Sequence, residues 1–229
     1  MIGILTRAAI ASEADEQRRL RSLTADIFAP VLPGAADVSI EVLRRGKNLT
    51  SIDARLSQQG EVLARASVSL GTPRKTSLSH APAPVAPASV DWSSLQALPL
   101  GAPLGPVFAH HYEYRSFGPL PMSGGDKAET AGFVRAKART SPLDAPAVIA
   151  MLDVFWPAMF SVEKQPHSVA TVSFSAELVL DPRELSTEEP LLHVARLAAI
   201  DSGYMTEFRE LWSGQRLVAM NQQVMALLP

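Results

Sequence analysis

The chain has 229 residues, of which 47% are hydrophobic and 19% charged, and its formal net charge is −2. This length suffices for one large domain or two small ones with a sizeable core. The near-neutral charge gives no basic footprint for nucleic acid or acidic membranes. The lack of cysteine excludes disulfides, thiolate nucleophiles and cysteine metal ligands. No apolar run approaches the ~20 residues of a membrane span, and the apolar N-terminal part is too short for a secretory signal. We therefore expect a cytoplasmic protein.

The first part of the chain is predicted to form one helix and about four strands. Residues 2–13 carry apolar side chains at helical spacing. The segments that follow alternate at period two or read as strands, and turn residues separate them. They cover residues 21–31, 37–43, 49–58 and 61–70.

Residues 72–106 interrupt this pattern. They contain seven of the eighteen prolines of the chain, and proline cannot donate a hydrogen bond to a sheet ladder. We therefore divide the chain into a first unit at residues 1–71, a linker at 72–106 that Trp92 and Leu95 dock, and a second unit at 107–229.

The second unit is predicted to repeat the composition of the first. Strands are expected at residues 107–115 and 130–139. A helix should start at Ser141 and Pro142 and continue to Phe160, with a kink at Pro157. Further strands follow at residues 169–180, 191–199, 204–212 and 216–228. A helix against an antiparallel sheet, twice, is an α+β architecture.

The two units also resemble each other in sequence. A unit that recurs once indicates a duplicated fold whose halves pack on each other. In such a pair, one half can lose its active site while the other keeps it. The aligned pairs are Phe28 with Phe174, Val42 with Val194, Leu56 with Leu211, and Ala64 with Ala219.

Asp153 is the first candidate for chemistry. Its neighbours at helical spacing are all apolar, among them Ile149, Trp156 and Phe160. This pattern predicts a buried carboxylate, and such groups are concentrated at functional positions. The alternative is a structural acid that caps a loop or pairs with an arginine.

Two further segments carry polar side chains. By alternation, Thr171 shares a strand face with Ser173 and Ser175. The last strand contains Gln222 and Gln223 between apolar residues, and buried amides need hydrogen-bond partners. Alternation does not determine which of the two glutamines points into a pocket.

Together these features resemble the type II acyl-CoA thioesterases, which have a double hotdog fold. In that family a long helix is wrapped by a curved antiparallel sheet in each of two units. The similar segments are an arginine–glycine turn at residues 41–47, a glutamine–glycine hairpin at 56–66, Asp153, residues 170–172, and residues 217–219 followed by Gln223. Three departures are that the chain starts within the first helix, that Lys47 stands where arginine is usual, and that the linker is longer and more proline-rich than in the shortest family members.

The resemblance implies that Asp153, Thr171 and Gln223 hold the water that attacks an acyl-CoA thioester. It implies no cofactor and no metal. Phe155, Trp156 and Met225 are expected to line a tunnel for the acyl chain. Because Thr171 aligns on Ala25 and Gln223 on Val68, we expect one catalytic site per chain. Exposed sheet edges favour a homodimer.

Two other functions remain open from the sequence. One is a hotdog protein that binds acyl-CoA, or serves as an assembly partner, without catalysis. The other is a dehydratase or hydratase, which would need a histidine in the loop entering the helix, and residues 137–146 contain none. His167 and His193 are isolated and are expected at the surface or at strand ends, and the adjacent His110 and His111 should point to opposite faces of a strand.

Overall fold

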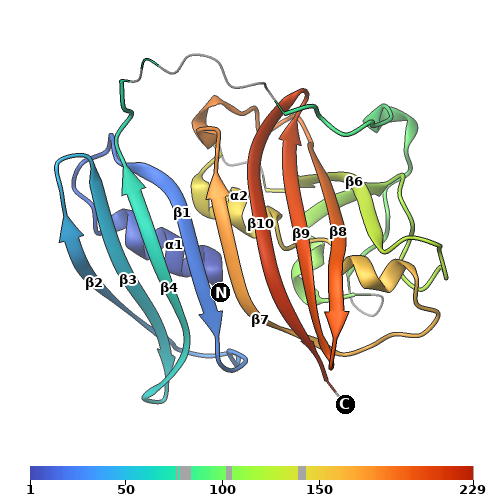
Figure 1. Ribbon diagram of the computed structural model, residues 1–229, viewed down its shortest axis with the longest axis horizontal. Coiled ribbons are helices and arrows are strands. Elements are labelled where there is room, and N and C mark those ends of the chain that lie inside the picture. Colours follow the sequence, from blue (N-terminus) through green and yellow to red (C-terminus); the bar gives the residue numbers. More distant parts are fainter. Residues whose placement is uncertain (76, 78–83, 102–104, 139–142, 229) are drawn as a thin grey trace.

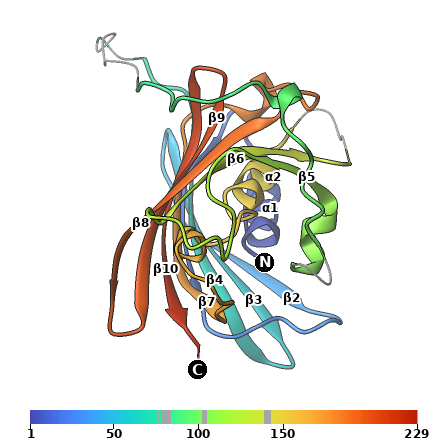
Figure 2. The same cartoon turned by 90° about the vertical axis from the view of Figure 1, so that its right-hand side faces the viewer.

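The computed structural model describes residues 1–75, 77, 84–101, 105–138 and 143–228. Its main feature is one ten-stranded sheet that curves around two helices (Figures 1 and 2). The strand order is β2-β3-β4-β1-β7-β10-β9-β8-β6-β5, and every pairing is antiparallel. The fold is therefore an α+β double hotdog, as the sequence predicted.

The first unit, in this description, consists of one helix and four strands. They are α1 (Ile2–Ala11), β1 (Arg19–Ile27), β2 (Asp37–Arg45), β3 (Leu49–Gln58) and β4 (Glu61–Gly71). The second unit contains the equivalent α2 (Ala145–Met151), β7 (Val169–Leu178), β8 (Leu191–Asp201), β9 (Tyr204–Ser213) and β10 (Arg216–Leu227), preceded by β5 (Tyr112–Ser116) and β6 (Glu129–Ala136).

Several predicted element bounds differ from those of the structure. The first strand ends at Ile27 because the next two N–H groups both turn to the carbonyl of Leu63. Residues 107–111 form a 3₁₀ turn, not a strand, so the argument that placed His110 and His111 on opposite strand faces does not apply. The helix α2 starts at Ala145, capped by Asp144, whose side chain accepts from the N–H of Ala147. The expected start at residues 141–142 lies outside the described residues.

The duplication is recorded in the irregularities of the sheet. The β2–β3 pair has a register shift between residues 42 and 44, and the β8–β9 pair between 197 and 199. The β3–β4 hairpin shifts after Leu56 and Ala64, and the β9–β10 hairpin at Leu211 and Ala219. Both sets differ by 155 positions (42 to 197, 56 to 211). Bulges that recur at matching places are inherited features of the fold.

A third shared bulge relates the strands that join the two units. β1 shifts between residues 20 and 22 beside β4, and β7 shifts between 171 and 173 beside β10. This offset is 151 positions (20 to 171). Thr24 of β1 pairs with Ser175 of β7, its own equivalent, and their hydroxyls lie 3.3 Å apart. A local twofold axis therefore passes between these two residues.

These registers test the sequence alignment of the repeat. Leu56 with Leu211 and Ala64 with Ala219 are confirmed. The other two pairs are wrong. The bulges make Leu197 the equivalent of Val42, and they make Phe174 the equivalent of Leu23. Weak similarity could not locate the bulges, and each bulge changes the spacing by one residue.

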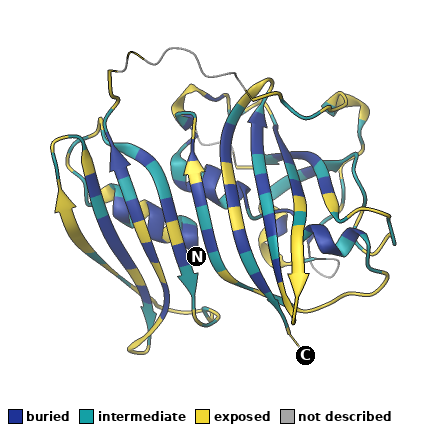
Figure 3. Ribbon diagram, viewed as in Figure 1, coloured by how far each residue is buried: buried dark blue, intermediate teal, exposed yellow. Residues whose placement is uncertain are grey.

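The core is continuous across both units. Its largest buried cluster includes Leu5 of α1 and Ile52 of β3 together with Ile149 of α2 and Leu211 of β9. Along the strands buried and exposed residues alternate, so the helices cover one face of the sheet (Figures 2 and 3). The halves are thus packed into one body by apolar burial.

The described part of the 72–106 segment is docked by the residues that the sequence indicated. Trp92 and Leu95 pack against a cluster formed by Phe133, Leu192 and Trp212. Arg115 donates to the carbonyls of Trp92 and Leu95, each at 3.0 Å, and its guanidinium lies 4.2 Å from the centre of the Trp92 ring. The boundaries at residues 71 and 107 stay a prediction. Within the described ranges, no helix is long and apolar enough to cross a membrane.

Candidate active site

Asp153 lies in the turn that follows α2, not within the expected long helix. The helix ends at Met151, and the N–H of Asp153 closes a tight turn onto the carbonyl of Ala150 at 3.0 Å. Pro157 lies six residues beyond this end and precedes the 3₁₀ turn Ala158–Ser161, so the predicted kink within a helix does not occur. The side chain of Asp153 is 44% exposed. The prediction of a buried carboxylate is therefore wrong.

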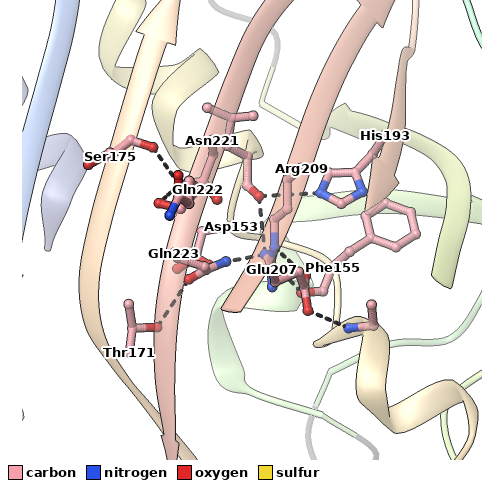
Figure 4. Close-up of polar contacts among 12 residues, drawn as sticks. Asp153, Phe155, Thr171, Ser175, His193, Glu207, Arg209, Asn221, Gln222 and Gln223 are labelled. Atoms are coloured by element: carbon pink, nitrogen blue, oxygen red, sulfur yellow. Dashed lines mark hydrogen bonds and ion pairs between the residues drawn. The ribbon is translucent and has the colours of Figure 1, made fainter. Parts of the chain in front are cut away.

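A buried arginine of β9 holds this turn. The side chain of Arg209 is 1% exposed, and its Nη1 lies 3.1 Å from Oδ1 of Asp153 (Figure 4). The same nitrogen donates to the carbonyls of Leu152, at 3.1 Å, and Phe155, at 3.4 Å. Carbonyls at the end of a helix have no partner within the helix. Arg209 supplies one and orients Asp153 in the same step.

Glu207 compensates the charge of Arg209 from two positions earlier on the same strand. Its side chain is fully buried, and Oε1 accepts from Nε of Arg209 at 2.7 Å. Oε2 accepts from the N–H of Ala158 at 2.7 Å. Both oxygens of the buried carboxylate are thus bonded, which a buried charge requires. The pair joins β9 to the chain on both sides of Pro157.

His193 of β8 completes the buried polar cluster. It is 0% exposed, stacks on Phe155 with ring centres 4.5 Å apart, and its Nε2 lies 3.3 Å from the carbonyl of Leu152. Burial, and then the charge of Arg209, lowers the pKa of His193 to about 3. The ring is therefore neutral near pH 7, and the contact with Leu152 requires the proton on Nε2. The expectation of a surface or strand-end histidine is wrong.

The amide of Gln223 is compatible with two orientations. In one, Nε2 donates to Oδ1 of Asp153 and Oε1 accepts from Oγ1 of Thr171, both at 3.3 Å. That orientation turns the amide NH₂ toward the guanidinium of Arg209, which is also a donor. In the swapped orientation, the amide oxygen accepts from Nε of Arg209 at 2.7 Å and from Nη2 at 3.1 Å. We favour the swapped orientation because it gains two short hydrogen bonds from Arg209 and gives up only the 3.3 Å bond to Oδ1 of Asp153.

The swapped amide determines what Thr171 can do. The NH₂ group of Gln223 then faces the Thr171 hydroxyl, which accepts its hydrogen bond. The proton of that hydroxyl becomes free to donate to another acceptor. Of the two candidate glutamines, Gln223 is 1% exposed and belongs to this cluster, whereas Gln222 is exposed.

A bulge brings Thr171 to this face of the sheet. Phe174 pairs with Gln223, but the next inward pair is Thr171 with Met225, because the register skips one residue of β7. The skipped residue changes the facing of the strand, so Thr171 does not share the face of Ser173 and Ser175, as alternation predicted. Bulges commonly redirect a side chain beside an active site.

The three residues expected to line a tunnel are accounted for differently. Phe155 is buried between His193, Tyr114 and Trp156. Met225 is buried in a separate cluster with Met159 and Met205, beside Thr171. Trp156 is half-buried, and its Nε1 is buried without a hydrogen-bond partner among the described residues. Their role along an acyl chain stays a prediction.

Sequence reasoning missed Arg209, Glu207 and His193. The available signal was the alternation of side chains in β9, which places Glu207 and Arg209 on the same face as the apolar Met205 and Leu211. Charged residues in register with a core face need buried partners. The sequence did not reveal that these partners include the turn at Asp153.

Four of the equivalent positions in the first unit, those on strands, are apolar. The offsets established by the bulges match Gln223 to Val68, Arg209 to Ala54, Glu207 to Ile52 and Thr171 to Leu20, each of which is buried. The match of Gln223 to Val68 is as the sequence predicted. The match of Thr171 to Ala25 is wrong, because the alignment did not place the bulge.

Comparisons with known proteins agree with this arrangement. The family model for the acyl-CoA thioesterase N-terminal domain matches residues 1–71, and the model for the C-terminal domain matches residues 78–227. Together they define the class of protein as a thioester hydrolase. The chain belongs to the acyl-CoA thioesterase family. No curated protein sequence matches it.

Solved structures show the same fold. A protein of unknown function with a hotdog fold from Alicyclobacillus acidocaldarius has a TM-score of 0.88 at 23% identity, covering 99% of this chain and 85% of the other. The tesB protein of Mycobacterium avium subsp. paratuberculosis has a TM-score of 0.78 at 17% identity, covering 100% and 85%. An acyl-CoA thioesterase II, TesB2, from Mycobacterium marinum has a TM-score of 0.76 at 17% identity, covering 99% and 87%.

Proposed function

We propose that the chain hydrolyses acyl-CoA thioesters to a free fatty acid and CoA, using a water held by Asp153, Thr171 and Gln223. The observation that carries the proposal is a continuous chain of polar contacts. Arg209 bonds to both Asp153 and the Gln223 amide, and that amide contacts Thr171. Three elements that are distant in sequence thereby present their polar groups to one place.

Each group has a role that follows from its contacts. Oδ1 of Asp153 faces Arg209, so Oδ2 is the oxygen that accepts the proton of the attacking water. The hydroxyl of Thr171 accepts from Gln223 and donates its own proton to the water oxygen. The water is then held by a base and a donor in an orientation suited to attack.

The reaction balances without a covalent intermediate. The water oxygen adds to the thioester carbonyl while Asp153 takes one proton. The tetrahedral intermediate collapses, the carbon–sulfur bond breaks, and Asp153 returns the proton to the leaving thiolate. The products are the carboxylic acid, which ionises at neutral pH, and the CoA thiol. Phe155, Trp156 and Met225 lie around Asp153 and Thr171 and would accompany the acyl chain.

Replacement of Asp153 tests the assignment. Asp153→Asn keeps the shape but removes the proton acceptor, and general-base catalysis contributes about 10²–10⁴-fold. We expect a loss of that size in kcat, measured as free thiol release from a panel of acyl-CoAs, with little change in the affinity for a thioether analogue. The control is Asp126→Asn at an exposed position.

The same assay separates hydrolysis from binding without catalysis. If Asp153→Asn hydrolyses every acyl-CoA as fast as the wild type, the assignment is wrong. If the wild type binds acyl-CoA and hydrolyses none, the chain is a non-catalytic binder.

The expected homodimer and cytoplasmic location belong to the same proposal. Strands β2 and β5 end the described sheet, and β2 exposes Val42 and Leu43, so light scattering should report twice the mass of the chain.

A further inference from the structure

A cavity of about 860 Å³ lies at the junction of the two units, away from Asp153. It is lined by the end of α1, the start of β1, the end of β7 and the start of α2, and Leu20 and Val179 are part of its wall. Ligand pockets usually measure about 300–1,000 Å³. Its size is therefore that of a small-molecule site.

The position of the cavity follows from the duplication. Leu20 is the equivalent of Thr171, and the end of α1 is the equivalent of the turn that carries Asp153. The local twofold axis at Thr24 and Ser175 exchanges the two places. The cavity thus adjoins, in the first unit, the place that the candidate active site occupies in the second, with Leu20 in its wall. The residues equivalent to Thr171 and Gln223, Leu20 and Val68, are apolar, so the first unit lacks these two polar groups of the candidate active site.

The lining combines apolar walls with arginines. Leu20, Leu178 and Val179 supply apolar surface, and the lining also contains four acidic residues, Glu16, Asp144, Asp181 and Glu184. With six arginines against four acids, the lining carries a net charge of +2 (6 − 4). The arginines are Arg7, Arg18, Arg19, Arg21, Arg74 and Arg183.

Several arginine donors are not used within the protein. Arg7 pairs with Asp144 at 2.8 Å, and Arg19 and Arg183 share Asp181 at 2.6 and 3.1 Å. Nε of Arg19, however, is buried without a partner among the described residues. Arg21 bonds only through Nε, to the carbonyl of Gly71 at 3.2 Å, and Arg74 makes no hydrogen bond or ion pair within the described part of the chain.

We propose that this cavity binds an anionic amphiphile without hydrolysing it. The apolar wall would take the chain of the ligand, and the arginines would take its carboxylate or phosphate head, since guanidinium groups match both. A released fatty acid and an intact acyl-CoA share this chemistry. The inference goes beyond the proposed hydrolysis and does not depend on it, because none of the proposed catalytic residues lines the cavity.

Two substitutions test the site. Val179→Trp fills the cavity from a residue that is 55% exposed. Arg74→Glu reverses an unpaired charge at its rim, and its matched control is Arg44→Glu, an exposed arginine of β2 outside the cavity. Reversing an exposed charge about 6 Å from an anion changes the affinity by about tenfold in water.

Binding is measured by equilibrium dialysis with dodecanoate in one arm and the S-dodecyl thioether of CoA in the other. We expect Val179→Trp to bind one ligand fewer per chain than the wild type, and Arg74→Glu to bind about tenfold more weakly while Arg44→Glu matches the wild type. The arm that responds identifies the head group. If Val179→Trp fails to fold, Arg74→Glu alone decides. The proposal is overturned if the wild type binds neither ligand, or if neither variant changes stoichiometry or affinity.

Discussion

Removing the guanidinium of Arg209 should strongly destabilise the protein. Arg209 is 2% exposed and Glu207 is 0% exposed, so Arg209→Met leaves a buried carboxylate with only the Ala158 N–H as partner. Breaking a buried ion pair by removing one partner costs about 3–5 kcal/mol. The carbonyls of Leu152 and Phe155 lose a donor as well. The free energy of unfolding should therefore fall by about 3–5 kcal/mol.

The measurement is urea-induced unfolding of the wild type and variants. In thermal unfolding, Tm of a chain of this size falls by roughly 2–4 °C for each kcal/mol of stability that is lost. The control is Arg196→Met. Arg196 is exposed and lies over the Phe208 ring at 4.7 Å, so its removal should stay within about 0.5 kcal/mol.

A rescue distinguishes the buried charge from lost packing. Combining Arg209→Met with Glu207→Gln removes the stranded charge while an amide oxygen still accepts from Ala158. The double variant should be more stable than Arg209→Met alone. A typical hydrogen bond contributes about 1 kcal/mol. The reasoning is refuted if the free energy of unfolding of Arg209→Met differs from that of the wild type by less than about this amount. It is also refuted if the double variant is no more stable than Arg209→Met.

Two further outcomes are expected. Thr171→Ala and Gln223→Ala should each reduce kcat less than Asp153→Asn does, because each removes a hydrogen bond of about 1 kcal/mol, and equal losses in thiol release would contradict that order. His193 has a folded-state pKa of about 3 against an ordinary 6.5, so the unfolded chain takes up the proton first as the pH falls. The stability that depends on a neutral His193 is fully present above pH 6.5 and falls as the pH drops below it. At pH 5 the free energy of unfolding is lower by about 2 kcal/mol. Unfolding at pH 7 and pH 5 should show this difference in the wild type and not in His193→Gln.

The element types and the duplication were readable from the sequence. Period-two alternation and glycine turns identified the strands, because those signals are local. The polar positions Asp153, Thr171 and Gln223 came from a family resemblance in order and spacing. Even the docking of Trp92 could be predicted, since a large aromatic residue in a proline-rich segment needs apolar cover.

What the sequence could not decide depends on contacts between distant segments. The burial of Asp153 was predicted from helical neighbours, but the helix ends before it, and Arg209, 56 residues away, determines its surroundings. Alternation placed Thr171 on the wrong face, because a bulge in β7 depends on the strand beside it. Hydrophobic periodicity reports only which side of a strand is buried. The partner of a buried charge and the position of a bulge are set by which strands pair, and only the tertiary structure contains that information.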